Sequence, residues 1–211
     1  MGVNMLDKSV KHLGVVMIRN NNGGYLKYRL PEGFTFVTFQ EGDELEWAKI
    51  ETSVEEFIGI DKALEHFKKE FGNQYEKVKE RCIFIKDKHG QKIATAMAWE
   101  GQLQNSELPR VHWVAVKKDY QGIGLSKALI TKILDLYKEL GEKRNVYLTT
   151  QTWSYKAINI YKKFGFKPFD DMKRGKQEGV AGNFECDFNL AWNIINEKIE
   201  AYEEYKDVHI E

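Results

Sequence analysis

Cysteine is scarce in this chain, and long apolar runs are missing. Cys82 and Cys186 are the only cysteines among 211 residues, too few for a disulfide framework or a CxxC metal pattern. We expect two buried or idle thiols in a reducing compartment and no bound metal. No apolar run reaches the length of a membrane span, and residues 1–14 lack the apolar core of a signal peptide. These absences predict a cytoplasmic protein without a membrane partner.

An excess of charge of either sign is also absent. Lysine plus arginine and aspartate plus glutamate number 32 each. This balance provides no global attraction to nucleic acid or to an anionic membrane, so neither is an expected partner. The 42% hydrophobic and 30% charged residues are typical of a soluble globular protein, and the length is sufficient for one substantial core.

Apolar spacing and turn signals predict strands that alternate with helices. Strands are expected at 13–18, 34–39, 81–87, 91–99, 110–116, 145–151 and 166–169. Helices are expected at 41–57, 60–72, 125–140, 154–165 and 188–205, with Asp43 and Ser154 as N-caps of the first and fourth. Segment 170–183 is polar and reads as a long loop. The pattern indicates one mixed α/β domain with helices packed on a central sheet.

The stretch QGIGLSKALI, residues 121–130, places two glycines between a strand and a helix. The first amides of a helix lack intrahelical partners and carry positive potential, and glycine lets a ligand come close to the backbone. Such a turn suits a phosphate. No Walker A loop is present, and Lys127 stands where a dinucleotide fingerprint needs glycine. On this stretch alone, a phosphate site and a ligand-free turn explain the glycines equally well.

The wider stretch VAVKKDYQGIGLSKALI resembles the acyl-CoA signature of the GCN5-related N-acetyltransferase (GNAT) family. That signature is Gln or Arg, two residues, Gly, one residue, then Gly or Ala; here its positions hold Gln121, Gly124 and Ser126. SYKAINIYKKFGF resembles the family's second block, N-x-x-A-I-x-x-Y-x-x-x-G-F, in which Ser154 replaces the asparagine. The residues in register are Ala157, Ile158, Tyr161, Gly165 and Phe166. The resemblance is specific over 80–169 and looser over 34–79.

The resemblance implies the GNAT acyl-CoA N-acyltransferase fold. This is an α/β (α+β) architecture with a mixed central sheet flanked by helices. We expect the GNAT domain to span 34–169. Residues 1–33 would form an N-terminal extension with an extra strand, and 170–211 would add a polar loop and a C-terminal helix to the same domain.

The resemblance further implies transfer of an acetyl group from acetyl-CoA to a primary amine, by direct attack in a ternary complex. The implied cofactor-binding residues are Val114, Ala115 and Val116 for the pantetheine arm, Gln121, Gly122, Ile123, Gly124, Leu125, Ser126 and Lys127 for the pyrophosphate, and Ser154. Tyr161 matches the family's acid for the leaving thiolate; the alternative is a core aromatic, and a buried ring whose hydroxyl points at the sulfur would combine the two, so the register match favours the acid. The alternative function is a catalytically idle acyl-CoA sensor on the same fold.

Two residues are candidate bases for the acceptor amine. His112, expected to face the same side as Val114 and Val116, titrates in a suitable range, although a buried core histidine is the plainer interpretation. Glu100 is the other candidate base. Its alternative interpretation is a solvated carboxylate at the end of a strand.

The acceptor itself is left open by the sequence. Glu51, Glu55 and Glu56, with Asp170 and Asp171 opposite, would suit a cationic acceptor, or form a solvated helix face. A small molecule, a peptide N-terminus and a protein lysine all stay open as acceptors. A homodimer is compatible with the sequence.

Overall fold

The computed structural model describes residues 6–169 and 188–209. These residues form two compact units, and segment 92–116 contributes to both. The first unit holds 26–100 and 109–143; the second holds 6–25, 101–108, 144–169 and 188–209. The predicted loop 170–183, Asp170, Asp171 and Cys186 lie outside the described residues, and the predicted domain boundaries stay predictions.

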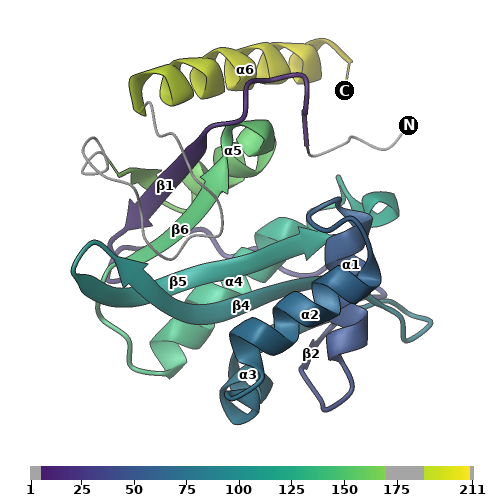
Figure 1. Cartoon of the computed structure of the whole chain (residues 1–211). Helices are drawn as coiled ribbons and strands as arrows, with labels where there is room; N and C mark the ends of the chain where they lie inside the picture. The colour runs from purple at the N-terminus through teal and green to yellow at the C-terminus, as the bar shows by residue number, and fades with distance from the viewer. Residues whose placement is uncertain (1–5, 170–187, 210–211) are drawn as a thin grey trace. The chain divides into compact units, whose positions relative to one another are not determined.

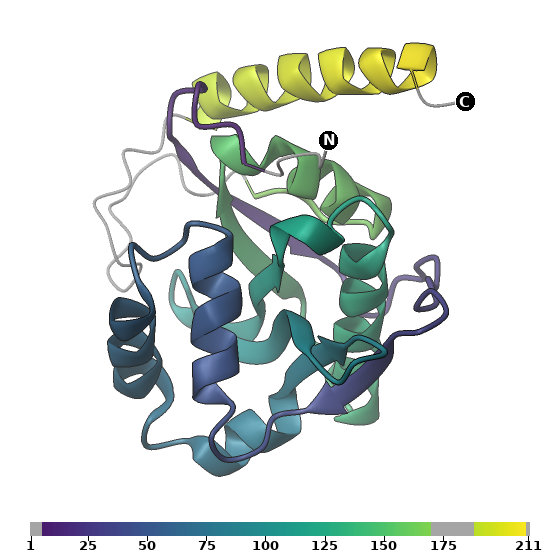
Figure 2. The ribbon, with the colours of Figure 1, turned by 90° about the vertical axis from the view of Figure 1, so that its right-hand side faces the viewer.

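The first unit contains a sheet with helices on both faces. Its strands follow the order β2-β3-β4-β5, and β3 runs antiparallel to both β2 and β4. The strands are β2 (Thr35–Thr38), β3 (Cys82–Lys86), β4 (Lys92–Leu103) and β5 (Ser106–Val116). The helices are α1 (Glu44–Ser53), α2 (Ile60–Phe71), α3 (Tyr75–Arg81) and α4 (Leu125–Glu139). Figures 1 and 2 show α1 and α2 on one face of β4 and β5, and α4 on the other.

An aromatic core fills the space between α1, α2 and the sheet. Helix α2 presents Ala63, Phe67 and Phe71 at intervals of four residues, and all three are buried, as an amphipathic helix requires. Trp47 of α1 is fully buried, with its ring centroid 5.1 Å from that of Phe67. Each large apolar side chain buried here contributes roughly 1.5–3 kcal/mol.

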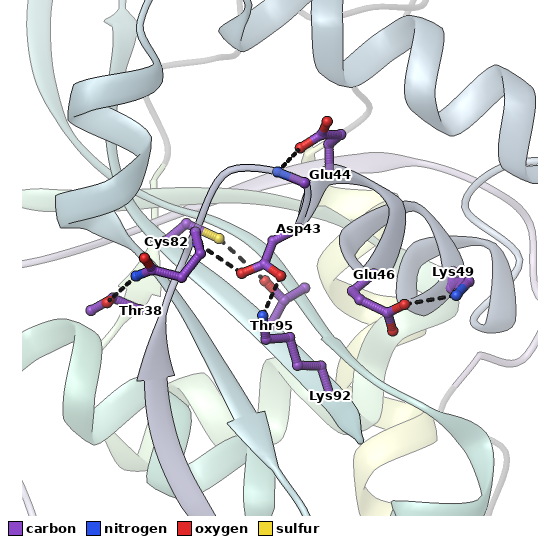
Figure 3. A network of polar contacts seen from close by, with 10 residues as sticks. Thr38, Asp43, Glu44, Glu46, Lys49, Cys82, Lys92 and Thr95 are labelled. Atoms are coloured by element: carbon purple, nitrogen blue, oxygen red, sulfur yellow. Dashed lines mark hydrogen bonds and ion pairs between the residues drawn. The ribbon is translucent and has the colours of Figure 1, made fainter. Parts of the chain in front are cut away.

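Asp43 occupies the N-cap position of α1, as predicted, but its side chain does not cap the helix. One carboxylate oxygen accepts the backbone N–H of Gln40 at 2.7 Å, and the other pairs with Lys92 of β4. Cys82 of β3 lies in the same region, with its Sγ 3.7 Å from Oγ1 of Thr95 (Figure 3). The start of α1 is therefore tied to the sheet by an ion pair.

The second unit contains three further strands and two helices. The strands are β1 (Gly14–Arg19), β6 (Val146–Gln151) and β7 (Lys167–Pro168), and the helices are α5 (Tyr155–Lys163) and α6 (Phe188–His209). The order is β5-β6-β1-β7, with β5 represented by its first residues. Strand β1 is antiparallel to β6 and β7, and α6 contacts α5 and β1 (Figure 1). Val16, Leu103 and Tyr147 form a small buried core.

The predicted strands and helices are all present, and the mixed α/β class is confirmed. Helix α1 ends at Ser53 rather than at residue 57, and Glu55 just beyond it has a φ of 65°. Strands β4 and β5 are longer than predicted because they form one hairpin, in whose turn Gln104 has a φ of 54°. Helix α3 was missed because Val78 is its one buried residue, so no apolar stripe marks it. Ser154 precedes α5 without a capping bond from its side chain.

Candidate active site

The loop between β5 and α4 is shaped by two glycines in the left-handed region. Gly122 has a φ of 88° and Gly124 a φ of 93°, conformations that side chains with a Cβ adopt only at a cost. A short 3-10 turn, Lys118–Tyr120, precedes them, and α4 starts at Leu125. The backbone conformation alone therefore explains why glycine stands at both positions.

The loop is fastened to the sheet at two points. The side-chain amide of Gln121 donates to the carbonyl of Val116 at 2.8 Å. The hydroxyl of Tyr120 donates to Asp87, in the β3–β4 turn, at 2.9 Å. Gln121 therefore braces the loop with its side chain, and what the loop offers outward is its backbone.

The backbone N–H groups of the loop are not used by the described part of the protein. Among the residues that the structure describes, no protein acceptor receives the N–H groups of residues 122–126. A Cβ added to Gly122 or Gly124 would meet no atom within 4 Å. Helix α4 adds the positive end of its dipole at the same place. An array of free N–H groups at a helix start can hold a phosphate or pyrophosphate, so the loop fits the diphosphate of coenzyme A.

Lysines flank the loop. Lys118 pairs with Glu55, and the Nζ of Lys127 lies 5.2 Å from the centroid of the Tyr28 ring. Burial lowers the pKa of Lys117. These side chains add positive charge to that of the backbone.

Strand β5 departs from regular alternation at Trp113, which has a φ of 47°. His112 and Trp113 are neighbours in sequence, yet both contact Glu70 of α2. Ala115 belongs to the core against α1 and α2, so strand alternation directs Val114 and Val116 to the opposite face. The expectation that His112 shares a face with Val114 and Val116 is wrong, because the positive φ resets the alternation.

Glu70 is the centre of a network that the sequence analysis missed. Its Oε1 lies 2.7 Å from Nε2 of His112. Its Oε2 lies 2.9 Å from Nε2 of His66 and 3.1 Å from Nε1 of Trp113. The His66–Glu70 spacing of four residues on one helix is a signal that could have drawn attention to it. The link to β5 depends on tertiary structure and leaves no local signal.

The network fixes the charge of its members. Burial would raise the pKa of Glu70, but the hydrogen bonds from His112, His66 and Trp113 lower it well below its usual range. Burial, followed by the charge of Arg110, lowers the pKa of His112 to about 4, although Glu70 acts in the opposite direction. At neutral pH a neutral His112 therefore donates to an ionised Glu70.

Glu100, the other candidate base, lies within β4 and faces two cations. Its carboxylate pairs with Lys77, and its Oε1 lies 3.3 Å from Nη1 of Arg81. Burial would raise its pKa, but the hydrogen bond from Lys77 and the charge of Arg81 lower it overall. Both oxygens of Glu100 are held by cations, whereas Nδ1 of His112 has no recorded partner among the described residues, so the geometry favours His112 over Glu100.

Glu51 does not belong to a solvated helix face, so that interpretation of Glu51, Glu55 and Glu56 is corrected for Glu51. Its side chain is only 1% exposed, and its Oε1 has no hydrogen-bond partner in the described part of the chain. Burial, with the nearby charge of Glu56, raises its pKa well above the usual value. Glu55 and Glu56 are exposed, as expected.

Tyr161 and Ser154 belong to the second unit. Both are buried, at 8% exposure, and the Tyr161 ring centroid lies 6.1 Å from that of Phe166. Both readings of Tyr161, core aromatic and acid, are compatible with this burial, so the roles of Tyr161 and Ser154 stay predictions.

Two searches of the described ranges, 6–169 and 188–209, gave negative results. No helix there is both long and apolar enough to cross a membrane. No group of three or more His, Cys, Asp and Glu side chains there is arranged to hold a metal ion.

The family model for GNAT acetyltransferases matches residues 44–166, more than half of the chain. This chain belongs to the GNAT family. The match runs from the start of α1, through the glycine loop, to the Gly165–Phe166 pair of the second block. The resemblance inferred from the two sequence blocks is confirmed.

Curated relatives and a solved structure agree with the family. An N-alpha-acetyltransferase of Sulfurisphaera tokodaii is 28% identical over 38% of this chain and 59% of its own length. An uncharacterized N-acetyltransferase of Methanocaldococcus jannaschii is 30% identical over 38% of this chain and 35% of its own length. The match thus spans well under two thirds of either relative. A GCN5-related N-acetyltransferase from Sphaerobacter thermophilus superposes with a TM-score of 0.57 at 20% identity, covering 75% of this chain and 49% of that chain. The GNAT fold predicted for this chain is confirmed.

Proposed function

We propose that this GNAT protein is an acetyl-CoA-dependent N-acetyltransferase acting in the cytoplasm. The observations that carry the proposal are the N–H groups of residues 122–126, which have no acceptor in the described part of the chain, and the free space beside Gly122 and Gly124. A turn that only connected β5 to α4 would need the positive φ of its glycines, but it would not need space above them. Family membership and the free N–H groups together favour a nucleotide diphosphate as the occupant.

Each part of the cofactor has protein groups to hold it. The backbone of Val114, Ala115 and Val116 pairs with the pantetheine arm, and the loop from Gln121 to Lys127 holds the diphosphate through its amides. Ser154 is assigned to the cofactor by the sequence resemblance alone. The bound cofactor supplies an acetyl thioester, which an amine can attack directly once both are positioned.

His112 acts as the base in this proposal. Its neutral ring accepts a proton from the acceptor ammonium, and the freed amine lone pair forms the C–N bond as the C–S bond breaks. Tyr161 donates its proton to the leaving thiolate, and the second N–H proton, which the nitrogen loses as it becomes an amide, passes to solvent, from which Tyr161 is reprotonated. The products are the N-acetylated amine and the free thiol, and the proton held by His112 is returned to solvent.

The acceptor is an α-amino group in this proposal. A base whose pKa is about 4 takes a proton more easily from an α-ammonium, with a pKa of about 7.7–8.0, than from a lysine ammonium near 10.4. The difference of roughly 2.5 pKa units corresponds to about 3 kcal/mol. Relatives named N-alpha-acetyltransferase, from Sulfurisphaera tokodaii and Sulfolobus acidocaldarius, support the same class of acceptor.

Thiol release from acetyl-CoA tests the proposal. The panel contains peptides with a free α-amine and no lysine, the same peptides blocked at the N-terminus with one lysine added, and a small diamine. We expect release with the first group only, and a rise in melting temperature with acetyl-CoA alone. Stabilisation by acetyl-CoA without release for any amine would identify the idle sensor. No stabilisation by CoA or acetyl-CoA would remove the assignment of the loop.

A further inference from the structure

We propose that Glu70 is a positioning residue that fixes the tautomer of His112, so that Nδ1 of the ring is the atom left to accept a proton. Its part in catalysis rests on the proposed function, but the tautomer itself does not. The network that carries the inference joins helix α2 to the irregular point of β5.

Hydrogen-bond geometry determines which ring nitrogen carries the proton. An ionised carboxylate only accepts hydrogen bonds, and Oε1 of Glu70 lies 2.7 Å from Nε2 of His112. Nε2 must therefore carry the hydrogen. In a neutral imidazole the other nitrogen, Nδ1, then has a free lone pair. Within residues 6–169 and 188–209, no protein donor is recorded for that Nδ1.

The second oxygen of Glu70 prevents the carboxylate from turning away. Oε2 is engaged by Trp113 at 3.1 Å and by His66 at 2.9 Å. The indole N–H can only donate, so it needs an acceptor at this place. The positive φ of Trp113 brings that indole to the same carboxylate as the His112 ring. Glu70 is thus held in one orientation, with Oε1 directed at His112.

Charge gives Glu70 a second effect on His112. The charged or titratable groups that act on the ring are Glu70 and His66 from α2 and Arg110 from its own strand. Arg110 and His66 oppose a positive ring, and Glu70 favours one. When Nδ1 takes a proton, the new imidazolium charge lies beside the only anion among these groups. Removing the charge of Glu70 would make proton uptake by His112 less favourable.

Glu70→Gln is the discriminating variant because it keeps the size of the side chain but has one acceptor group and one donor group. Trp113 will take the carbonyl oxygen, since the indole cannot accept. The amide nitrogen is then left facing His112, and Nε2 must become an acceptor. The proton moves to Nδ1, the ring loses its available lone pair, and the packing is retained.

Long-range ¹H–¹⁵N spectra of the histidine rings test the tautomer without any substrate. In the wild-type protein at pH 7, we expect His112 to be protonated at Nε2 and unprotonated at Nδ1, with the two reversed in Glu70→Gln. Glu65→Gln, on the exposed side of the same helix and paired with Lys62, is the control and should leave the ring unchanged. A wild-type ring protonated at Nδ1 overturns the inference, even if the variant does not fold.

Kinetics test the consequence for the reaction. We expect kcat in Glu70→Gln to fall by about 10–100-fold, the range for residues that orient a reactive ligand, with KM for acetyl-CoA unchanged. The acidic limb of the pH profile should move to lower pH, because the imidazolium has lost its anion. A variant with wild-type kcat and pH profile overturns the inference. A wild-type protein that releases no thiol with any amine contradicts the proposed function instead, and the spectra then still decide the tautomer.

Discussion

The glycine loop and the carboxyl of Glu51 both carry polar groups without a protein partner, but their surroundings are opposite. The N–H groups of residues 122–126 have no acceptor in the described part of the chain, and a Cβ on Gly122 or Gly124 would meet no atom within 4 Å. Glu51 is 1% exposed, and its Oε1 is enclosed by the core of the first unit. An unpaired group open to water costs little until a ligand uses it, whereas an enclosed one costs about 1–3 kcal/mol. Accessibility decides which of the two is a binding site.

Glu70 is the intermediate case. Its carboxylate is partly buried, but three N–H donors satisfy it. Burial and hydrogen bonding act on its pKa in opposite directions, and the bonds prevail. For Glu51, with an unpartnered oxygen, burial prevails and the pKa rises. Two glutamates, on adjacent helices that pack on one core, thus have pKa values shifted in opposite directions because one has donors and the other does not.

A substitution that blocks the glycine loop should have the largest effect. Gly124→Val forces a β-branched residue into a φ of 93° and puts methyl groups where the backbone must meet the cofactor. We expect acetyl-CoA affinity to fall at least about 100-fold, or roughly 2.7 kcal/mol, measured by calorimetry.

Gly141→Val is the control for that change. Gly141 follows the other end of α4 with a φ of 71°, and a Cβ there also meets no atom within 4 Å. Both variants should lose about 1–2 kcal/mol of stability through backbone strain, but only Gly124→Val should lose binding. Equal affinities in the two variants would contradict the assignment of the loop.

In the proposed function the loop holds the cofactor but takes no part in the chemistry, so loss of turnover should be separable from loss of binding. Tyr161→Phe should lower kcat by about 10–100-fold through loss of the proton for the thiolate, with acetyl-CoA affinity unchanged by calorimetry. Tyr155→Phe, another buried tyrosine of α5, is the matched control and should keep its activity. Wild-type kcat in Tyr161→Phe would leave Tyr161 as a core aromatic.

The difference between loop and network also explains what the sequence could reveal. The loop is contiguous, and its two glycines are required locally by backbone conformation, so QGIG and the helix after it could be interpreted from the letters. The contacts of Glu70 come from two segments that are 42 positions apart and meet only on folding. They also depend on the φ of 47° at Trp113, which breaks the alternation on which strand faces are assigned.

The sequence likewise did not reveal which polar residues are buried. Glu51 follows the helical pattern of an acidic surface, and no sequence period marks a carboxyl as enclosed. Helix α3 was not predicted for a related reason, because its one buried residue, a valine, forms no apolar stripe. The strand and helix order succeeded because it depends on repeated apolar spacing, which single exceptions do not change.

Replacing Glu51 by an uncharged residue tests how its enclosed carboxyl affects stability. A carboxyl with a raised folded pKa holds its proton more tightly in the folded chain. Its contribution to stability is therefore present at low pH and is lost as the pH rises from the ordinary value of 4.5 through the raised one. Relative to wild type, Glu51→Gln should be about equally stable near pH 4 and about 1–3 kcal/mol more stable at pH 8, by urea unfolding.

Glu46→Gln is the control, since Glu46 forms an ordinary pair with Lys49 on the same helix. Its effect should stay within about 0.5 kcal/mol and vary little with pH. A Glu51→Gln difference that is the same at pH 4 and pH 8 would show that Glu51 does not titrate in this window.

The smallest effect is expected at Cys82, an enclosed group of another kind. Its thiol is fully buried, and burial raises its pKa to about 12, so at pH 7 only about one molecule in 100,000 carries the thiolate that reacts. In a Cys186→Ser background, a disulfide reagent should leave Cys82 unmodified in the native protein over hours and modify it fully in guanidinium. Acetyl-CoA should not change the rate at which Cys82 is modified, because its proposed binding loop is accessible whereas the thiol is enclosed in the core. Fast native modification would show that the sheet opens at β3, between β2 and β4, and that the thiol is enclosed only transiently.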